Sequence, residues 1–219
     1  MPAAPLDPVR SGTTALLLAL ALAVPAQAQA QAQAAPERGV FITQIADNSR
    51  VTVTQRKSDS LAQITQDGSD NGVALVQEGT APHRAKITQN GAGNEASARQ
   101  DGDGSTGLVL AQEGDDNSAI LLQRETAGGM KTGAAVQQTG NGNKLVLVQD
   151  GSDNQADLSQ VGDDNTMTAT QMGDGNRLQW AQNGDGLSDL QILQTGNAAM
   201  QITQSATGAQ FAPPPGTGG

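Results

Sequence analysis

Glutamine recurs along this chain mostly every 11 or 12 residues, and this regularity constrains the fold more than any other feature. Glycine often follows two residues after a glutamine, and asparagine often follows five residues after it. The repeating unit is Gln-x-Gly-x-x-Asn-x5-Gln. The glutamines in this spacing are Gln44, Gln55, Gln66, Gln77, Gln89, Gln100, Gln112, Gln123, Gln138, Gln149, Gln160, Gln171, Gln182, Gln194 and Gln204. Self-similarity at a short fixed period indicates a repeat architecture.

Between an asparagine and the next glutamine, apolar residues recur at every second position. In one unit, Leu178 and Trp180 lie between Asn176 and Gln182 in this way. A period of two is typical of a β-strand, because successive side chains of a strand point to opposite faces. We therefore predict an all-β fold of short strands with one buried face, and an inward position for Trp180.

Clusters of Asp, Gly and Asn separate the predicted strands, as at 67–71, 113–117 and 161–165. Such clusters favour turns, because Gly and Asn tolerate positive φ and because Asp and Asn bond back to neighbouring backbone. A short strand cannot bury its apolar face alone, whereas stacked copies build a continuous core. We predict a β-solenoid over 40–204, with about 11 residues per strand unit, about 22 per coil and roughly seven coils. The long interval after Gln123 predicts a looped bulge at 125–134.

The inward amides are expected to form ladders. A buried amide is costly unless it is paired, but identical amides stacked in register donate to one neighbour and accept from the other. They would fix the register, because a one-residue slip breaks both the apolar face and the ladder. The predicted ladder residues are Gln66, Asn71, Gln77, Gln89, Asn94, Gln100, Gln112, Asn117, Gln123, Gln138, Asn143, Gln149, Asn154, Gln160, Asn165, Gln171, Asn176 and Gln182. The predicted turn glycines are Gly68, Gly91, Gly114, Gly140, Gly151, Gly162 and Gly173.

The composition argues against several other classes of protein. Only Phe41, Trp180 and Phe211 are aromatic, and the absence of Cys rules out disulfides and thiolate metal sites. A formal net charge of −10 opposes binding to nucleic acid. No catalytic, cofactor-binding or metal-ligating constellation stands apart from the repeat, so we do not expect an enzyme. His83, the single histidine, is expected to be a solvated turn residue.

The two ends of the chain differ from the repeat. Arg10 precedes an apolar run at 13–24, which Pro25 and a small-residue pattern at 26–28 follow. The run is too short to cross a bilayer, and the whole pattern is typical of a secretory signal peptide. We predict a signal peptide at 1–28, a flexible leader at 29–39 and a flexible Pro/Gly-rich tail at 205–219.

The repeat resembles the curlin repeat of bacterial curli fibre subunits, whose pattern is Ser-x5-Gln-x-Gly-x-x-Asn-x-Ala-x3-Gln. The resemblance covers roughly residues 40–204. The units that begin at Gln89, Gln112 and Gln149 match the pattern from Gln to Gln. The unit at Gln66 adds the initial Ser60 and has Val73 in place of the Ala.

This resemblance implies a secreted structural subunit of extracellular amyloid fibres on the bacterial surface, of the fimbrium or pilus kind, acting in cell adhesion and biofilm matrix. It implies templated end-to-end polymerisation of the chain with itself and with other curlin subunits or a nucleator. It also implies export through an outer-membrane secretion pore with periplasmic chaperones. It implies no cofactor.

The sequence also bears on how assembly would start and be restrained. We recognise no polar cap at either end of the repeat, so the last coil of one molecule is expected to template the first coil of the next. The aspartates of the turns are expected to repel one another when stacked and to slow assembly before export.

Four other interpretations are weighed against the fibre subunit. A monomeric secreted solenoid adhesin fits the same repeat, and acidic Gly-rich turns also occur in calcium-binding β-rolls, although those repeat every nine residues or so. Disorder fits the polar composition but does not require constant spacing. The fourth interpretation is an ice-binding or polysaccharide-binding face of outward threonines, but Ala111 and Ser159 interrupt the row of threonines. Its threonines would be Thr43, Thr65, Thr88, Thr170 and Thr203.

Overall fold

A computed structural model describes residues 38–56 and 59–212 of the chain, and within them all regular secondary structure is β-strand. The all-β prediction is therefore confirmed. The strands are β1 (Gly39–Ile45), β2 (Arg50–Gln55), β3 (Leu61–Asp67), β4 (Gly72–Gln77), β5 (Arg84–Asn90), β6 (Glu95–Gly102), β7 (Ser105–Glu113), β8 (Ser118–Glu125), β9 (Lys131–Thr139), β10 (Lys144–Gly151), β11 (Gln155–Val161), β12 (Thr166–Met172), β13 (Arg177–Asn183), β14 (Ile192–Thr195), β15 (Ala199–Ser205) and β16 (Gly208–Ala212).

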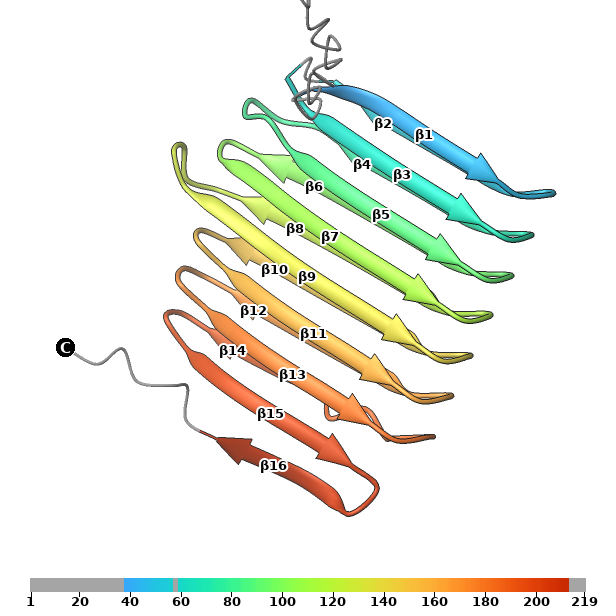
Figure 1. Cartoon of the computed structure of the whole chain (residues 1–219). Helices are drawn as coiled ribbons and strands as arrows, with labels where there is room; N and C mark the ends of the chain where they lie inside the picture. Colours follow the sequence, from blue (N-terminus) through green and yellow to red (C-terminus); the bar gives the residue numbers. More distant parts are fainter. Residues whose placement is uncertain (1–37, 57–58, 213–219) are drawn as a thin grey trace, which may run out of the picture. The chain divides into compact units, whose positions relative to one another are not determined.

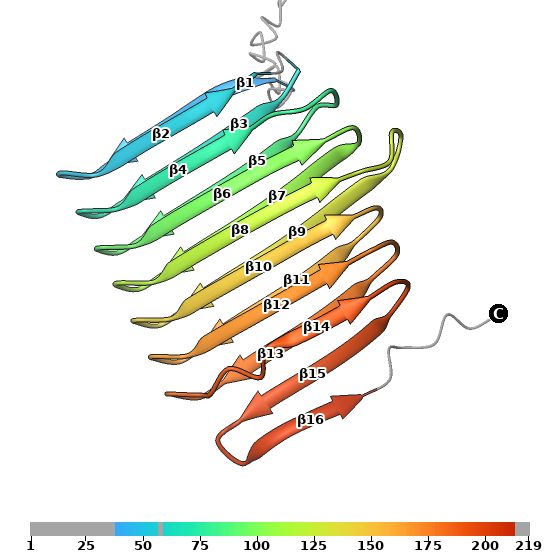
Figure 2. The same cartoon turned by 180° about the vertical axis from the view of Figure 1, so that it is seen from behind.

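The strands form two sheets, each built from every second strand of the chain (Figures 1 and 2). Sheet A contains the odd-numbered strands β1 to β15 followed by β16, and sheet B contains the seven even-numbered strands β2 to β14. Every pairing from β1 to β15 is parallel, with like positions of the repeat opposite one another, as Gln66 lies between Gln44 and Gln89. One coil is therefore a strand of each sheet and two turns, mostly 22 or 23 residues. The predicted β-solenoid is confirmed.

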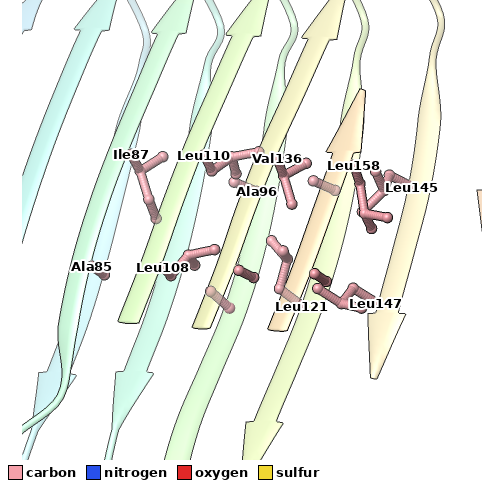
Figure 3. Packing of buried hydrophobic residues seen from close by; sticks show 14 of the residues in the cluster. Ala85, Ile87, Ala96, Leu108, Leu110, Leu121, Val136, Leu145, Leu147 and Leu158 are labelled. Carbon is pink, nitrogen blue, oxygen red and sulfur yellow. The ribbon is translucent and has the colours of Figure 1, made fainter. Parts of the chain in front are cut away.

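The core lies between the two sheets and consists of columns of apolar side chains that run along the solenoid (Figure 3). Sheet A contributes one column through Ile87, Leu110 and Leu158, and sheet B contributes Ala96 and Leu145 at the facing positions. These residues are buried because the alternation of the sequence places every second side chain inward. Trp180 is 1% exposed, which confirms its predicted inward position.

The turns stack in register as the strands do, and glycine is required where they approach. Gly91 has a φ of 113°, and a Cβ there would lie 2.2 Å from the carbonyl oxygen of Gly114 in the next coil. Only glycine combines that φ with so close a backbone approach. All seven predicted turn glycines have positive φ: Gly68, Gly91, Gly114, Gly140, Gly151, Gly162 and Gly173.

The repeat is interrupted once between β8 and β9, as the long glutamine interval predicts. The loop spans 126–130 and lengthens that coil to 26 residues, whereas 131–134, which we expected in the loop, belong to β9. The carboxylate of Glu125 is fully buried beneath the loop. It accepts hydrogen bonds from Thr132 Oγ1 at 2.9 Å and from the N–H of Ala127 at 3.0 Å. Glu125 thus holds the inserted segment against the regular coils.

The C-terminal end departs from the predicted boundaries. The tail predicted at 205–219 is wrong for Ser205, which ends β15, and for 208–212, because β16 turns back and pairs antiparallel with β15, with Ile202 opposite Phe211. Gly208, with a φ of 128°, permits the tight turn, and the otherwise unpaired edge of β15 offers backbone partners. The flexible leader predicted at 29–39 also ends too late, because β1 begins at Gly39. The predicted signal peptide at 1–28 and the last seven residues, 213–219, lie outside the described residues.

Candidate functional site: the amide ladders and the solenoid ends

The ladder glutamines form two continuous rows of side-chain hydrogen bonds. In sheet A each Nε2 donates to the Oε1 of the glutamine in the next coil, from Gln44 to Gln204, at 2.7–3.0 Å. Sheet B has the same row from Gln55 to Gln194, at 2.6–3.0 Å. All these bonds point the same way along the solenoid. Both ladders are therefore polar, with acceptor oxygens toward the first coil and donor groups toward the last.

From Gln77 to Gln182, each ladder amide also donates to a carbonyl oxygen of the opposite sheet. Gln89 Nε2 also donates to the carbonyl oxygen of Gly72 at 3.1 Å, and Gln100 Nε2 donates to that of Arg84 at 3.0 Å. In each pair the glutamine and the carbonyl belong to opposite sheets. Because these amides are fully buried, each depends on its neighbour coil and on the facing sheet for its hydrogen bonds.

The asparagines at the turns from sheet A to sheet B bond mainly to the main chain. The N–H of Asn94 donates to Asn71 Oδ1 at 3.0 Å, and Asn94 Nδ2 donates to the carbonyl oxygen of Gly114 at 2.7 Å. Asn117 and Asn143 make equivalent bonds. This column ends at Asn165, whose Nδ2 is buried without a partner. Leu187 occupies the next position of the column, so the regular turn geometry stops there.

A second inward column lies at the turns from sheet B to sheet A, and it contains His83. The prediction that His83 is a solvated turn residue is therefore wrong. The His83 side chain is fully buried. Its Nε2–H donates to the carbonyl oxygen of Glu78, and its Nδ1 accepts from Thr106 Oγ1 at 3.0 Å. The N–H of His83 donates to Ser60 Oγ at 3.0 Å. The column contains Ser60, His83, Thr106, Thr132, Asn154 and Asn176.

The inward position of His83 could not be predicted from the repeat, because the number of residues between the preceding glutamine and this column changes along the chain. His83 follows Gln77 by six residues, whereas Asn154 follows Gln149 by five, so the two positions do not align by counting. Burial lowers the pKa of the His83 imidazole from its ordinary 6.5, against the opposing effects of its bond to Glu78 and of the Asp101 charge. The neutral ring is therefore the form that the column accommodates.

The aspartates in the turns from sheet A to sheet B are exposed, and several of them accept hydrogen bonds from the neighbouring coil. Asp115 Oδ1 accepts the N–H of Ala92 at 2.7 Å, and Asp163 Oδ1 accepts the N–H of Asn141 at 2.7 Å. Asn141 Oδ1 plays the same part for the N–H of Asp115 at 2.8 Å. Within residues 38–56 and 59–212, no group of three or more His, Cys, Asp or Glu side chains could hold a metal ion.

The two ends of the solenoid are unlike. At the first coil, no described strand pairs with the outer edges of β1 and β2, and the side chains of Phe41 and Ile42 are each 46% exposed. At the last coil, β16 covers the edge of β15, whereas no described strand pairs with the outer edge of β14 (Figure 2). The expectation that neither end has a capping element is therefore wrong for sheet A at the last coil, because β16 lies beyond the last repeat glutamine.

The outward threonines do not form one surface. Thr43, Thr65 and Thr88 are adjacent in sheet A, and Thr203 lies in the same column, but Thr170 belongs to sheet B. The alternative of a single threonine face, weighed above, does not hold for Thr170, which lies in the other sheet. Counting from each glutamine mixes the two sheets, because successive units alternate between them.

Comparisons with protein-family models, with curated proteins and with solved structures find no match to this chain. No helix among the described residues is both long and apolar enough to cross a membrane.

Proposed function

We propose that this chain is the secreted structural subunit of an extracellular, curli-like amyloid fibre, which grows by end-to-end templating and acts in surface adhesion and in biofilm matrix. The proposal includes export through an outer-membrane pore with periplasmic chaperones, and assembly with other curlin subunits or a nucleator. It is supported by the resemblance of the repeat to the curlin pattern and by the complementary ends of the solenoid.

The observation that carries the proposal is the polarity of the two glutamine ladders. At the last coil Gln204 and Gln194 accept the final ladder bonds, so their Nε2 groups have no ladder acceptor beyond them. At the first coil Gln44 and Gln55 donate the first ladder bonds, so their Oε1 atoms have no ladder donor before them. The parallel strands that carry them give the two ends the same spacing and register. A second copy can therefore continue both sheets and both ladders. Such a contact is heterologous and does not close, so it generates a filament.

The strand β16 sets a condition on this junction. The edge of β15 is already paired over residues 201–205 with β16, so a second molecule must displace β16 before it can extend sheet A. The edge of β14 in sheet B needs no such displacement. A monomer protected in this way would stay soluble until it meets a growing end, in line with the lag expected of nucleated polymerisation.

The same strand favours a second candidate function. If β16 is not displaced, the chain is a solenoid with one covered edge at its last coil, and it would act as a monomeric secreted adhesin. The two candidates differ in one measurable property, which is whether the folded chain recruits further copies of itself.

Seeded polymerisation distinguishes them. The chain from residue 29 is purified from denaturant, diluted without calcium and followed by thioflavin fluorescence, with sonicated product as seed and an equal mass of unpolymerised chain as control. The fibre proposal expects a lag that only the seeds shorten, and fibre diffraction near 4.7 and about 10 Å. A chain that stays soluble without dye binding supports the adhesin, and one that folds only after calcium is added supports a β-roll.

A further inference from the structure

A shallow trough of about 1060 Å³ runs along the outer face of sheet A, where its strands begin. Small residues such as Gly107, Gly133 and Ala135 make its floor. The side chain of Lys131 lies across Gly107, with Cε 3.3 Å and Nζ 3.8 Å from the position that a Cβ on Gly107 would occupy. The glycine floor therefore gives a long cationic side chain room to lie in the trough.

The lining of the trough carries a net positive charge, opposite in sign to the net charge of the chain. Arg84, Lys86, Lys131 and Arg177 line it, against the single carboxylate of Asp157, although the chain as a whole has a net charge of −10. Arg177 pairs with Asp153 at 2.8 Å. Lys86 and Lys131 are exposed, and neither forms an ion pair within the described part of the chain.

The cations recur at every second strand of sheet A. They belong to β5, β9 and β13, whereas the intervening β7 and β11 place Val109 and Asp157 among the lining residues. Neighbouring strands lie ~4.8 Å apart, so strands that carry a cation recur every ~10 Å along the solenoid, with Lys131 two residues before the position that Arg84 and Arg177 share.

Exposed carboxylates repeat with the same two-strand period at the opposite edge of sheet A, but they follow the intervening strands. The turns after β3, β7 and β11 each carry at least two of them, whereas the turns after β5 and β9, residues 90–94 and 139–143, carry none. The turn after β13 carries only Asp185. We call these carboxylates the acidic turn row: Asp67, Asp70, Glu113, Asp115, Asp116, Asp163 and Asp164.

We propose that the trough of one molecule receives the acidic turn row of a second copy of this chain, side by side. The two surfaces have opposite charge and the same two-strand period, so several ion pairs form at once in a single register. They lie at opposite ends of the sheet A strands, so the contact is heterologous and adds further copies laterally. Each molecule contributes to this contact through the sides of its own coils, so the contact does not depend on the end-to-end junction of the proposed function.

The test is the self-association of the full chain before polymerisation, measured by sedimentation velocity at low and at high ionic strength. Lys131→Glu reverses the central charge of the trough. Lys144→Glu is the matched charge reversal, because Lys144 is also exposed and also begins a strand, but in sheet B, where its strand neighbours Ser118 and Thr166 follow two turns of the acidic turn row. Asp115→Asn with Asp163→Asn removes two of the seven charges of the acidic turn row and keeps its backbone bonds, since Asn141 makes the same bond in the intervening coil. Circular dichroism and the denaturation midpoint check the fold of each variant.

The expected result is association that weakens at least about tenfold at high ionic strength. It should weaken by a similar factor in Lys131→Glu and in the double Asp→Asn variant, and it should not weaken in Lys144→Glu, which makes the acidic edge more negative. Association that ignores salt, or that falls equally in the two Lys→Glu variants, overturns the proposal. Association that weakens in Lys131→Glu but not in the double Asp→Asn variant also overturns the proposal. The trough would then bind another polyanion, which the addition of an acidic polysaccharide or DNA would identify. The sedimentation measurements need no fibre, so a failure of this proposal can be distinguished from a failure of the chain to polymerise.

Discussion

Gln89 and Gln112 are joined by an amide–amide hydrogen bond of 2.8 Å in the interior of the solenoid, and each is at most 1% exposed. Gln89 in turn accepts from Gln66 at 2.7 Å, so its removal would leave partners unsatisfied in two coils and across the sheets. The amide is therefore a structural element of the stack as much as any aliphatic core residue.

Replacement of Gln89 by Ala should lower the free energy of unfolding by about 2–4 kcal/mol, because buried amide groups of its neighbours lose their partners. It should also slow fibre formation. Gln179→Ala removes an exposed glutamine from the outer face of sheet A and should change stability by less than about 0.5 kcal/mol. Denaturant titration and the thioflavin lag time of both variants check this. Equal lag times would contradict the ladder account.

Replacement of Gly91 by Ala should destabilise the stack by more than about 2 kcal/mol. The new Cβ would meet the carbonyl oxygen of Gly114 at 2.2 Å, and alanine disfavours a φ of 113°. Gly72→Ala is the control, because its Cβ would meet nothing closer than 3.9 Å and its φ is ordinary. Thermal melting of the two variants should separate them clearly. A Gly91→Ala chain as stable as Gly72→Ala would refute the stacked-turn geometry.

The buried His83 should make the fold sensitive to mild acid. Its pKa is lowered below 6.5 in the folded chain, so its contribution to stability is complete above about pH 6.5 and is lost as the pH falls from there through the folded-state pKa. His83→Asn places in the column the residue that Asn154 and Asn176 already provide. Denaturation at pH 7.5 and about pH 5 should show a smaller loss in the variant than in the parent chain. Equal losses would show that carboxylates alone cause the pH dependence.

Deletion of residues 206–219 should speed polymerisation, because it removes β16 from the edge of β15. The elongation rate on preformed seeds, measured at equal chain concentration, should rise severalfold. The matched control deletes only 213–219, which leaves β16 in place. If both deletions have the same effect, β16 does not restrain growth.

The regular part of the structure could be predicted because its sequence signals are local and repeated. Gln-to-Gln spacing, alternation around Trp180 and the Gly91-type turns follow from strand period and turn chemistry alone. The irregular parts have no repeat to reveal them. His83 fills an asparagine position after a turn that is one residue longer, Glu125 is buried only because of the inserted loop, and β16 pairs antiparallel outside the repeat.

The charged trough illustrates a second limit of the sequence. Arg84, Lys131 and Arg177 are far apart in the chain, and only the pairing of β5, β7, β9, β11 and β13 brings them to one face. The assignment of alternate units to two sheets would have been enough to find them. Treating all units as one column, as in the threonine interpretation, does not reveal that these charged residues share a face.

The most direct test of end-to-end continuation is a disulfide between two molecules in a fibre, since the chain contains no Cys. Leu193 and Thr54 occupy the same outward column at opposite ends of sheet B, away from β16. In a continued sheet their Cα atoms would lie ~4.8 Å apart, within reach of a disulfide. Fibres grown from a mixture of Leu193→Cys and Thr54→Cys chains and then oxidised should yield mixed dimers. Thr52→Cys, two residues out of register, should not pair with Leu193→Cys. Fibres that give no mixed dimer, or that cross-link Thr52→Cys as readily, would contradict the account.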